Sequence, residues 1–176
     1  IIAKLNLCGG KAVGLSGKDA HLINAKKKSV SRGLDLGFVG DIQKINPGII
    51  YVLLKENYIP VISPIGFGER GQTFNINADT TASHIAASLK AYKIIFMTDV
   101  NGISIKNKLC TELNVDDALK MVKSGDIKDG MKPKVEAAVF ALKNGVDSAQ
   151  VICGTESHSV ISELFTHDGI GTKITL

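Results

Sequence analysis

The sequence is poor in aromatic residues and contains no tryptophan. Phe, Tyr and Trp together make up 5% of its 176 residues. Stacking of nucleobases on aromatic side chains and a large aromatic interface are therefore not expected. The formal net charge is a modest +4, and its one dense run, Lys26 to Lys28, is typical of a solvated loop. We expect no nucleic-acid partner.

Cysteine and long apolar runs are scarce as well. Cys8, Cys110 and Cys153 are odd in number, far apart and without C-x-x-C spacing, which argues against a disulfide framework or a zinc site and favours a reducing compartment. The four histidines are too scattered to predict a metal site. No apolar run reaches the roughly 20 residues that span a bilayer, and no signal peptide is visible. We therefore expect no membrane partner, and a location in the cytoplasm or the plastid stroma.

The sequence also lacks an initiator methionine. It opens with IIAKLNLCGG, which is typical of the end of a helix that stops at Gly9-Gly10. A chain of this length has room for one sizeable core, and no linker or repeat divides it. We interpret residues 1–176 as a single domain that is a fragment without its upstream part.

Apolar runs that predict strands alternate with patterns that predict helices. The predicted strands are 12–16 (AVGLS), 59–63 (IPVIS), 93–98 (KIIFMT) and 149–154 (AQVICG). Continuous apolar runs are typical of parallel strands that are covered on both faces. The predicted helices are 46–57, with Asn46 as N-cap, 79–91, with Asp79 as cap, 114–125, 132–145 and 157–165. This order predicts an α/β fold, a three-layer sandwich with a mainly parallel central sheet.

One stretch interrupts the alternation. HLIN and GFVGDI, on either side of a basic segment between residues 18 and 41, predict a β-hairpin. A further short strand is expected within FGERGQTFNI, residues 67–76.

Three polar clusters follow predicted strands or open a predicted helix. In FNINAD, Asn75 and Asn77 are two residues apart and would share a side of an extended segment, where their amides could bind a carboxylate. Asp79 follows them, as a helix cap or as part of a substrate site. Since ligands of open α/β sheets bind beyond the carboxyl ends of strands, a substrate site is credible here.

The second cluster, TDVNG, comes directly after the predicted strand 93–98. Its Asn-Gly pair favours a tight turn. Asp99 could equally accept hydrogen bonds from a ribose or lie near a metal-bound phosphate.

The third cluster, DGMKPKVEAA, places Lys132 and Lys134 around Pro133 at the start of a helix. Cations there oppose the helix dipole, which prefers anions by roughly 0.3–1 kcal/mol. Two solvated lysines could tolerate this penalty. Alternatively, backbone N–H groups and Lys134 together bind phosphate, and Lys134 neutralises charge on a transferring phosphoryl group. No Walker A loop is present, because GLSGKD lacks both the earlier glycine and the Ser/Thr.

Five ordered motifs, AVGLSGKDA, DLGFVGDI, GQTFNINAD, TDVNGI and GMKPKVEAA, closely resemble the N-acetyl-L-glutamate kinases of the amino acid kinase family. The resemblance covers essentially the whole chain but only the later part of those enzymes. It implies ATP-dependent phosphorylation, with Mg²⁺, of the γ-carboxylate of N-acetyl-L-glutamate, the second step of arginine biosynthesis.

The resemblance also implies roles for individual residues. Asn75, with Asn77 beside it, should bind substrate, Asp79 should orient the catalytic lysines, and Lys134 should stabilise the transition state. The residues expected along the nucleotide are Asp99, Val100, Asn101, Gly102, Ile103 and Ser104, followed by Asp126, Ile127 and Lys128.

The stretch HSVISELFTHDGIGT resembles the carboxyl-terminal signature of arginine-inhibited, hexameric members. It implies that His158, Glu163 and Gly169 bind the inhibitor, and Glu163 is a suitable partner for a guanidinium. A homo-hexamer and a trimeric nitrogen-signalling protein are the partners implied for the full-length protein, besides its small-molecule substrates. A glycine-rich loop, a second catalytic lysine and a substrate-binding arginine of the family would precede residue 1, so the fragment alone is expected to be inactive.

Two alternatives stay open. One is another amino acid kinase with a different acceptor, such as carbamate or a nucleoside monophosphate, because the fold is shared but the acceptor pocket is not. The other, for the fragment itself, is a non-catalytic subunit that senses arginine or supports assembly.

Overall fold

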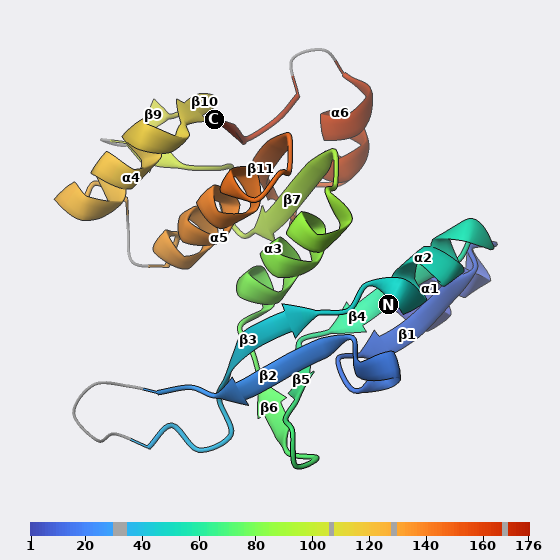
Figure 1. The fold of residues 1–176 in the computed structure, drawn as a ribbon. Helices are drawn as coiled ribbons and strands as arrows, with labels where there is room; N and C mark the ends of the chain where they lie inside the picture. The colour runs from blue at the N-terminus through green and yellow to red at the C-terminus, as the bar shows by residue number, and fades with distance from the viewer. Residues whose placement is uncertain (30–34, 106–107, 128–129, 167–168) are drawn as a thin grey trace. The chain divides into compact units, whose positions relative to one another are not determined.

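The structure, a computed structural model, describes residues 1–29, 35–105, 108–127, 130–166 and 169–176. They form two compact units, unit 1 from Ile1 to Thr81 and unit 2 from Ala82 to Leu176. The boundary falls inside helix α3 (Ala78–Leu89), drawn in green in Figure 1. None of the helices in these ranges is both long and apolar enough to cross a membrane.

Unit 1 contains two sheets. In the first, β1 (Ala12–Ser16) pairs in parallel with β4 (Ile59–Ser63). Helix α1 (Ile2–Leu7) packs on β1, and α2 (Gly48–Lys55) packs on β4. The second sheet has the strand order β3 (Gly40–Ile45), β2 (Ile23–Lys27), β5 (Ile65–Phe67), β6 (Thr73–Asn75). Its β2–β3 and β5–β6 pairs are antiparallel, and β2–β5 is parallel.

The buried side chains of unit 1 support mainly this second sheet and the loop that precedes it. Residues 18–27 contribute three of them, because the loop turns back under β2. The buried apolar residues of the unit are Ala12, Leu22, Ile23, Ala25, Ile50, Phe74 and Ile76.

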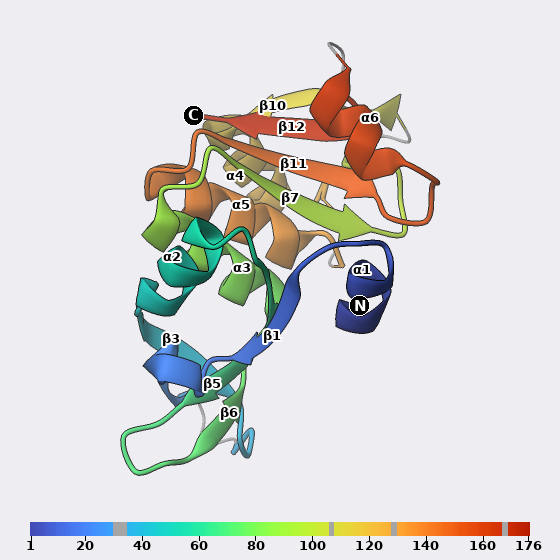
Figure 2. The same ribbon diagram turned by 90° about the vertical axis from the view of Figure 1, so that its right-hand side faces the viewer.

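Unit 2 is built around a sheet of order β10 (Glu112–Asn114), β12 (Thr172–Thr175), β11 (Ser148–Cys153), β7 (Lys93–Thr98). The β7–β11 and β10–β12 pairs are parallel, and β11–β12 is antiparallel. Figure 2 shows α4 (Val115–Ser124) and α5 (Lys132–Lys143) behind this sheet, with α6 (Ser159–Phe165) in front of it. A short hairpin, β8 (Ser104–Ile105) and β9 (Lys108–Leu109), follows β7.

The apolar core of unit 2 joins these layers. It includes Ile94 and Phe96 of β7, Ala149 and Val151 of β11, and Ile174 of β12, all buried. These residues alternate along their strands with residues that face away from the core cluster, as a pleated strand requires.

The predicted α/β class is confirmed, with parallel and antiparallel pairs side by side in the sheets. The predicted strands 12–16, 59–63 and 93–98 have the same bounds in the structure. The predicted hairpin is β2–β3. The prediction of Asn46 as a helix cap is wrong, because the Asn46 N–H donates to Leu22 O (2.9 Å) at the end of that hairpin, and α2 begins two residues later.

Candidate functional site

The candidate acceptor residues of unit 1 lie in and just after β6. Phe74 and Ile76 are buried, so the intervening side chains of Asn75 and Asn77 emerge on the exposed side of this segment. The backbone of Asn75 is fixed by a hydrogen bond from its N–H to Phe38 O (2.7 Å). The two amides therefore share a side, as the spacing predicts.

Asn77 rather than Asp79 caps helix α3. The Asn77 Oδ1 accepts hydrogen bonds from the backbone N–H of Thr80 (3.0 Å) and from its hydroxyl (3.3 Å). The prediction of Asp79 as the cap is wrong, since Asp79 lies inside the first turn. An amide two residues earlier reaches the same N–H groups, and the first turn is where the helix dipole favours a carboxylate.

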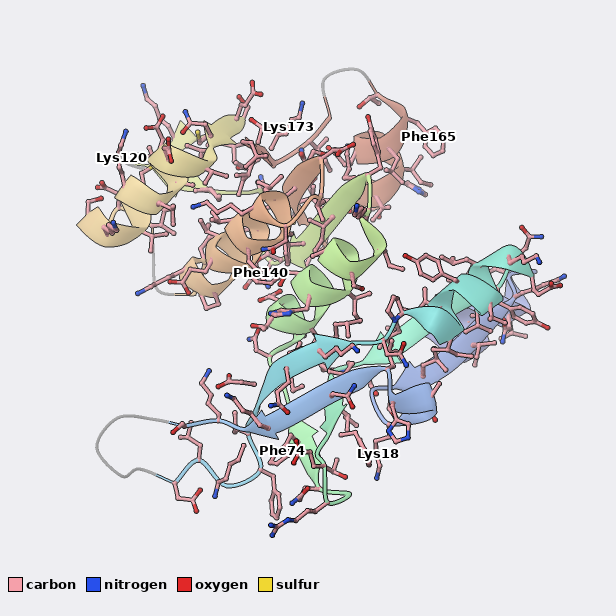
Figure 3. The ribbon with its side chains drawn as sticks, viewed as in Figure 1. Lys18, Phe74, Lys120, Phe140, Phe165 and Lys173 are labelled. Atoms are coloured by element: carbon pink, nitrogen blue, oxygen red, sulfur yellow. The ribbon has the colours of Figure 1, made fainter. Side chains whose placement is uncertain are left out.

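A cation that the sequence analysis did not assign lies beside these residues. The Lys18 ammonium donates to the Thr73 hydroxyl of β6 (3.2 Å), and Lys18 is labelled in Figure 3. The signal in the sequence was the stretch GLSGKD, which was considered only as a failed phosphate loop. Thr73 and Asn75 flank buried Phe74 and so lie on one side of the strand.

The candidate nucleotide segment of unit 2 follows β7. Its chain is partly exposed, at Asp99, Val100, Asn101 and Ser104, and partly buried, at Gly102 and Ile103. The Thr98 hydroxyl donates to Asp99 Oδ1 (3.1 Å), and the Gly154 N–H donates to Thr98 O (2.7 Å). The carboxyl ends of β7 and β11 are thereby joined at the start of this segment.

A buried hydroxyl of β12 holds the same segment in place. Thr172 Oγ1 accepts from the Ile103 N–H (2.8 Å) and donates to Cys110 O (2.5 Å). Gly102, at φ +141°, lies so close that a Cβ there would be 2.7 Å from this hydroxyl. A glycine is therefore required at this position, and the segment has a fixed backbone.

The second candidate nucleotide segment follows α4. Gly125 ends that helix in the left-handed conformation (φ +82°). Asp126 is exposed and accepts a hydrogen bond from the Ser124 hydroxyl (2.5 Å), whereas Ile127 is buried in the core of unit 2. The third candidate, Lys128, lies outside the described residues.

Lys132 and Lys134 differ in burial although they share the first turn of α5. Lys132 is exposed and Lys134 is half-buried, next to Val135, which is fully buried. Pro133 occupies the start of the helix, where its missing N–H has no consequence. The structure therefore distinguishes the two lysines, and Lys134 is the one held closer to the body of unit 2.

The candidate inhibitor residue Glu163 is buried and ion-paired. Its side chain is 3% exposed, and Lys93 Nζ lies 2.6 Å from its Oε1. The N–H of Ile170 donates to its Oε2 (3.0 Å), and Gln150 Nε2 in turn donates to Ile170 O (2.7 Å). A buried carboxylate with both oxygens bonded is held in one position. Lys93 and Gln150 were not predicted, because they come from strands far away in the sequence.

A cavity of about 730 Å³ in unit 2 brings several of these groups together. Its lining includes Glu163, Gly169 and the nucleotide candidate Asn101, with Lys93 and Gln150. A Cβ at Gly169 would lie 2.7 Å from Glu163 Oε2, so this glycine allows the carboxylate to approach the chain. His158 is exposed at the N-terminal end of α6, in the left-handed conformation (φ +63°). Gln150 Oε1 is buried without a hydrogen-bond partner among the described residues.

Two observations bear on metal and proton chemistry. In the part of the chain that the structure describes, no three His, Cys, Asp or Glu side chains gather in a group that could hold a metal ion. Burial lowers the pKa of His84, which stacks on Phe140 with ring centroids 4.1 Å apart. The acid–base groups of the described site are therefore carboxylates and lysines. Asp79 belongs to unit 1 and Lys134 to unit 2.

Comparisons with known proteins extend this description. A model of the amino acid kinase family matches residues 1–153. The acetylglutamate kinase of Pseudothermotoga lettingae is 48% identical over 174 residues, which are 99% of this chain and 62% of that protein. The acetylglutamate kinase of Aquifex aeolicus is 44% identical, over 100% of this chain and 64% of its own length. The chain thus spans less than two thirds of these relatives.

Solved structures with a similar fold include two of N-acetylglutamate synthase from Neisseria gonorrhoeae, both 28% identical. The complex with coenzyme A and N-acetyl-glutamate has a TM-score of 0.87 over 98% of this chain and 40% of that chain. The complex with coenzyme A and L-arginine has a TM-score of 0.82 over 94% and 38%. A Giardia carbamate kinase, 19% identical with a TM-score of 0.69 over 99% of this chain and 66% of that chain, shares the fold. The match over residues 1–153 settles the family: the chain belongs to the amino acid kinase family.

Proposed function

We propose that this chain is part of an N-acetyl-L-glutamate kinase, which transfers the γ-phosphoryl group of ATP to the γ-carboxylate of N-acetyl-L-glutamate. The observation that carries the proposal is its identity of 44–48% to acetylglutamate kinases over at least 99% of its length. A similar fold, that of the Neisseria synthase, is known in complex with N-acetyl-glutamate.

Phosphoryl transfer requires positioned reactants and compensation of charge rather than a covalent intermediate with the protein. ATP binds as its magnesium complex, along the segments 99–104 and 126–128. Lys134 lies against the transferring phosphoryl group and stabilises the charge that builds up there. Asp79 orients the catalytic lysines. Asn75, with Asn77 next to it, binds the acceptor.

Feedback inhibition by arginine is the regulatory part of the proposal. Glu163 and Gly169 line the cavity of unit 2, and a similar fold is known in complex with L-arginine. Because Lys93 already pairs with Glu163, an arginine guanidinium has to share or replace that ammonium group. His158 would complete the site from the start of α6.

Assembly belongs to the full-length protein. We propose a homo-hexamer, with a trimeric nitrogen-signalling protein as a further partner, in the cytoplasm or the plastid stroma. The family's glycine-rich loop, second catalytic lysine and substrate-binding arginine lie outside these 176 residues. We therefore expect the isolated chain to lack turnover.

The test is an assay of the complete protein with MgATP and a panel of acceptors, in which hydroxylamine traps the acyl phosphate as a hydroxamate. N-acetyl-L-glutamate should be the preferred acceptor, and arginine should inhibit. Preference for carbamate or a nucleoside monophosphate would show that the acceptor is wrong. Binding of arginine without binding of ATP or N-acetyl-L-glutamate would instead show a non-catalytic sensor.

A further inference from the structure

The loop between β1 and β2 holds Lys18 in a fixed place beside the candidate acceptor residues. The Gly17 N–H donates to Ile65 O (2.8 Å), and the Ile23 N–H donates to Gly17 O (2.9 Å). A Cβ at Gly17 would lie 2.1 Å from Ile65 O, so only glycine fits where the loop crosses β5. Two backbone bonds and this close approach fix the residue that precedes Lys18.

The same loop contains two strained residues. Ala20 and His21 have φ values of +49° and +52°, in the left-handed region that residues with a Cβ rarely adopt. The His21 ring packs edge-on against Phe67, with centroids 4.7 Å apart. Strain of this kind persists where surrounding contacts impose it, and it is concentrated at functional sites. The loop is thus held in one shape at the carboxyl end of β1.

The acid next to Lys18 is directed away from it. The Asp19 carboxylate accepts hydrogen bonds from the backbone N–H of Ser16 (2.6 Å) and from its hydroxyl (2.9 Å). These bonds, the backbone one first, lower the pKa of Asp19. The Lys18 ammonium contacts the neutral Thr73 hydroxyl and forms no ion pair with any residue that the structure describes. Its charge is therefore available to an anion.

The polar groups beside Lys18 follow one another along the chain. Thr73, Asn75 and Asn77 are spaced by two residues, roughly 7 Å apart in extended chain, and Asp79 follows in the first turn of α3. Lys18 thus marks the end of this row that is opposite to Asp79. An acceptor with two carboxylates needs a positive partner at each of them, since an unpaired carboxylate is costly to remove from water.

We propose that Lys18 binds the α-carboxylate of the acceptor, the one that is not phosphorylated. This inference rests on the proposed function, in which the γ-carboxylate reacts near Asp79. The Lys18 ammonium approaches from the Thr73 side, and the Asn75 amide binds the same end of the acceptor. Lys18 would determine the preference for acceptors that carry a charge beside the acetamido group.

Calorimetric titration of the complete protein with two ligands tests the inference. N-acetyl-L-glutamate carries both carboxylates, whereas 4-acetamidobutyrate lacks the α-carboxylate but retains the acetamido group and the other carboxylate. Lys18→Met should weaken binding of N-acetyl-L-glutamate about tenfold, which is the loss of one moderate charge contact. It should change binding of 4-acetamidobutyrate less than about twofold. Lys18→Arg should restore most of the affinity, and Lys44→Met, an exposed lysine of β3, should match wild type.

Unchanged binding of N-acetyl-L-glutamate by Lys18→Met would overturn the inference. Equal weakening of both ligands, or no binding of N-acetyl-L-glutamate by wild type, would overturn it as well. Hydroxamate formation is measured on the same samples. Selective weakening in a protein that forms no acyl phosphate would support the role of Lys18 and reject the kinase function. Turnover with unchanged affinities would do the reverse.

Discussion

The two units bury their parallel strands to very different degrees. All six residues of β11 are buried, whereas in β1 only Ala12 is buried, and β4 has no buried residue. In unit 2 β11 lies between two strands, with helices on both faces of the sheet (Figure 2). Within the described ranges β1 pairs with β4 alone.

This difference shows which unit closes its own core. Parallel strands are normally covered on both faces, and two strands alone are marginally stable. Unit 1 leaves apolar side chains exposed on the helices that cover this sheet, with Leu7 87% and Val52 59% exposed. The nucleotide and inhibitor candidates therefore rest on a packed core, whereas the acceptor candidates depend on hydrogen bonds of loops and short strands.

The largest expected effect is on catalysis, and it sharpens the contrast within unit 2. In the complete protein, Lys134→Met should lower kcat about a hundredfold or more, because it removes the charge that stabilises the transferring phosphoryl group. Lys132→Met, in the same turn but exposed, is the matched control and should change kcat less than about threefold. Steady-state kinetics with saturating MgATP measure both. Equal losses would show that the turn acts only through its overall charge.

The next effect tests the difference in packing directly. Ile174→Ala, at a fully buried position of β12, should lower the free energy of unfolding by about 2–5 kcal/mol. Ile62→Ala in half-buried β4 removes the same atoms and should have roughly half that effect or less. Urea unfolding followed by circular dichroism provides both values. Similar losses would mean that β4 is as well covered in the protein as β12.

A smaller effect is expected from the buried ion pair. Glu163→Gln keeps a group that can accept from the Ile170 N–H but leaves the largely buried Lys93 ammonium without its counter-charge. We expect a loss of about 1–3 kcal/mol in the free energy of unfolding and weaker inhibition by arginine. Glu112→Gln, an exposed acid of β10, is the control. Inhibition curves that overlay with wild type would remove Glu163 from the inhibitor site.

The smallest effect concerns pH. Burial lowers the pKa of His84 in the folded chain below its usual 6.5, so the unfolded chain takes up the proton more readily. The contribution of neutral His84 to stability is thus present above about pH 6.5 and decreases as the pH falls below that value. His84→Gln should reduce this pH dependence of the unfolding midpoint. A profile identical to wild type would show that His84 is not a source of it.

Sequence patterns predicted those elements that have a local cause. The strands 12–16, 59–63 and 93–98 have continuous apolar residues, and α4 has its cap at Asn114, whose side chain accepts from the Asp117 N–H (2.8 Å). Strands β10 and β12 were missed, because each has few residues and is stabilised by pairing across a long separation in the sequence.

The candidate site follows the same rule. The order Asn75, Asn77, Asp79 could be predicted from spacing, but which of them caps α3 depends on the path of the chain into the helix. The pairing of Lys93 with Glu163 joins residues 70 positions apart, and no local pattern indicates it. The hydroxyl of Thr172, which holds the segment at Ile103, is equally distant from it in the sequence.

The most direct test is a crystal structure of the complete protein with a non-hydrolysable ATP analogue, Mg²⁺ and N-acetyl-L-glutamate. The measurement is the distance from Lys134 Nζ to the nearest oxygen of the terminal phosphoryl group. We predict a hydrogen-bond distance of about 3 Å. A fully occupied nucleotide with that ammonium group directed into bulk solvent would contradict the proposed mechanism.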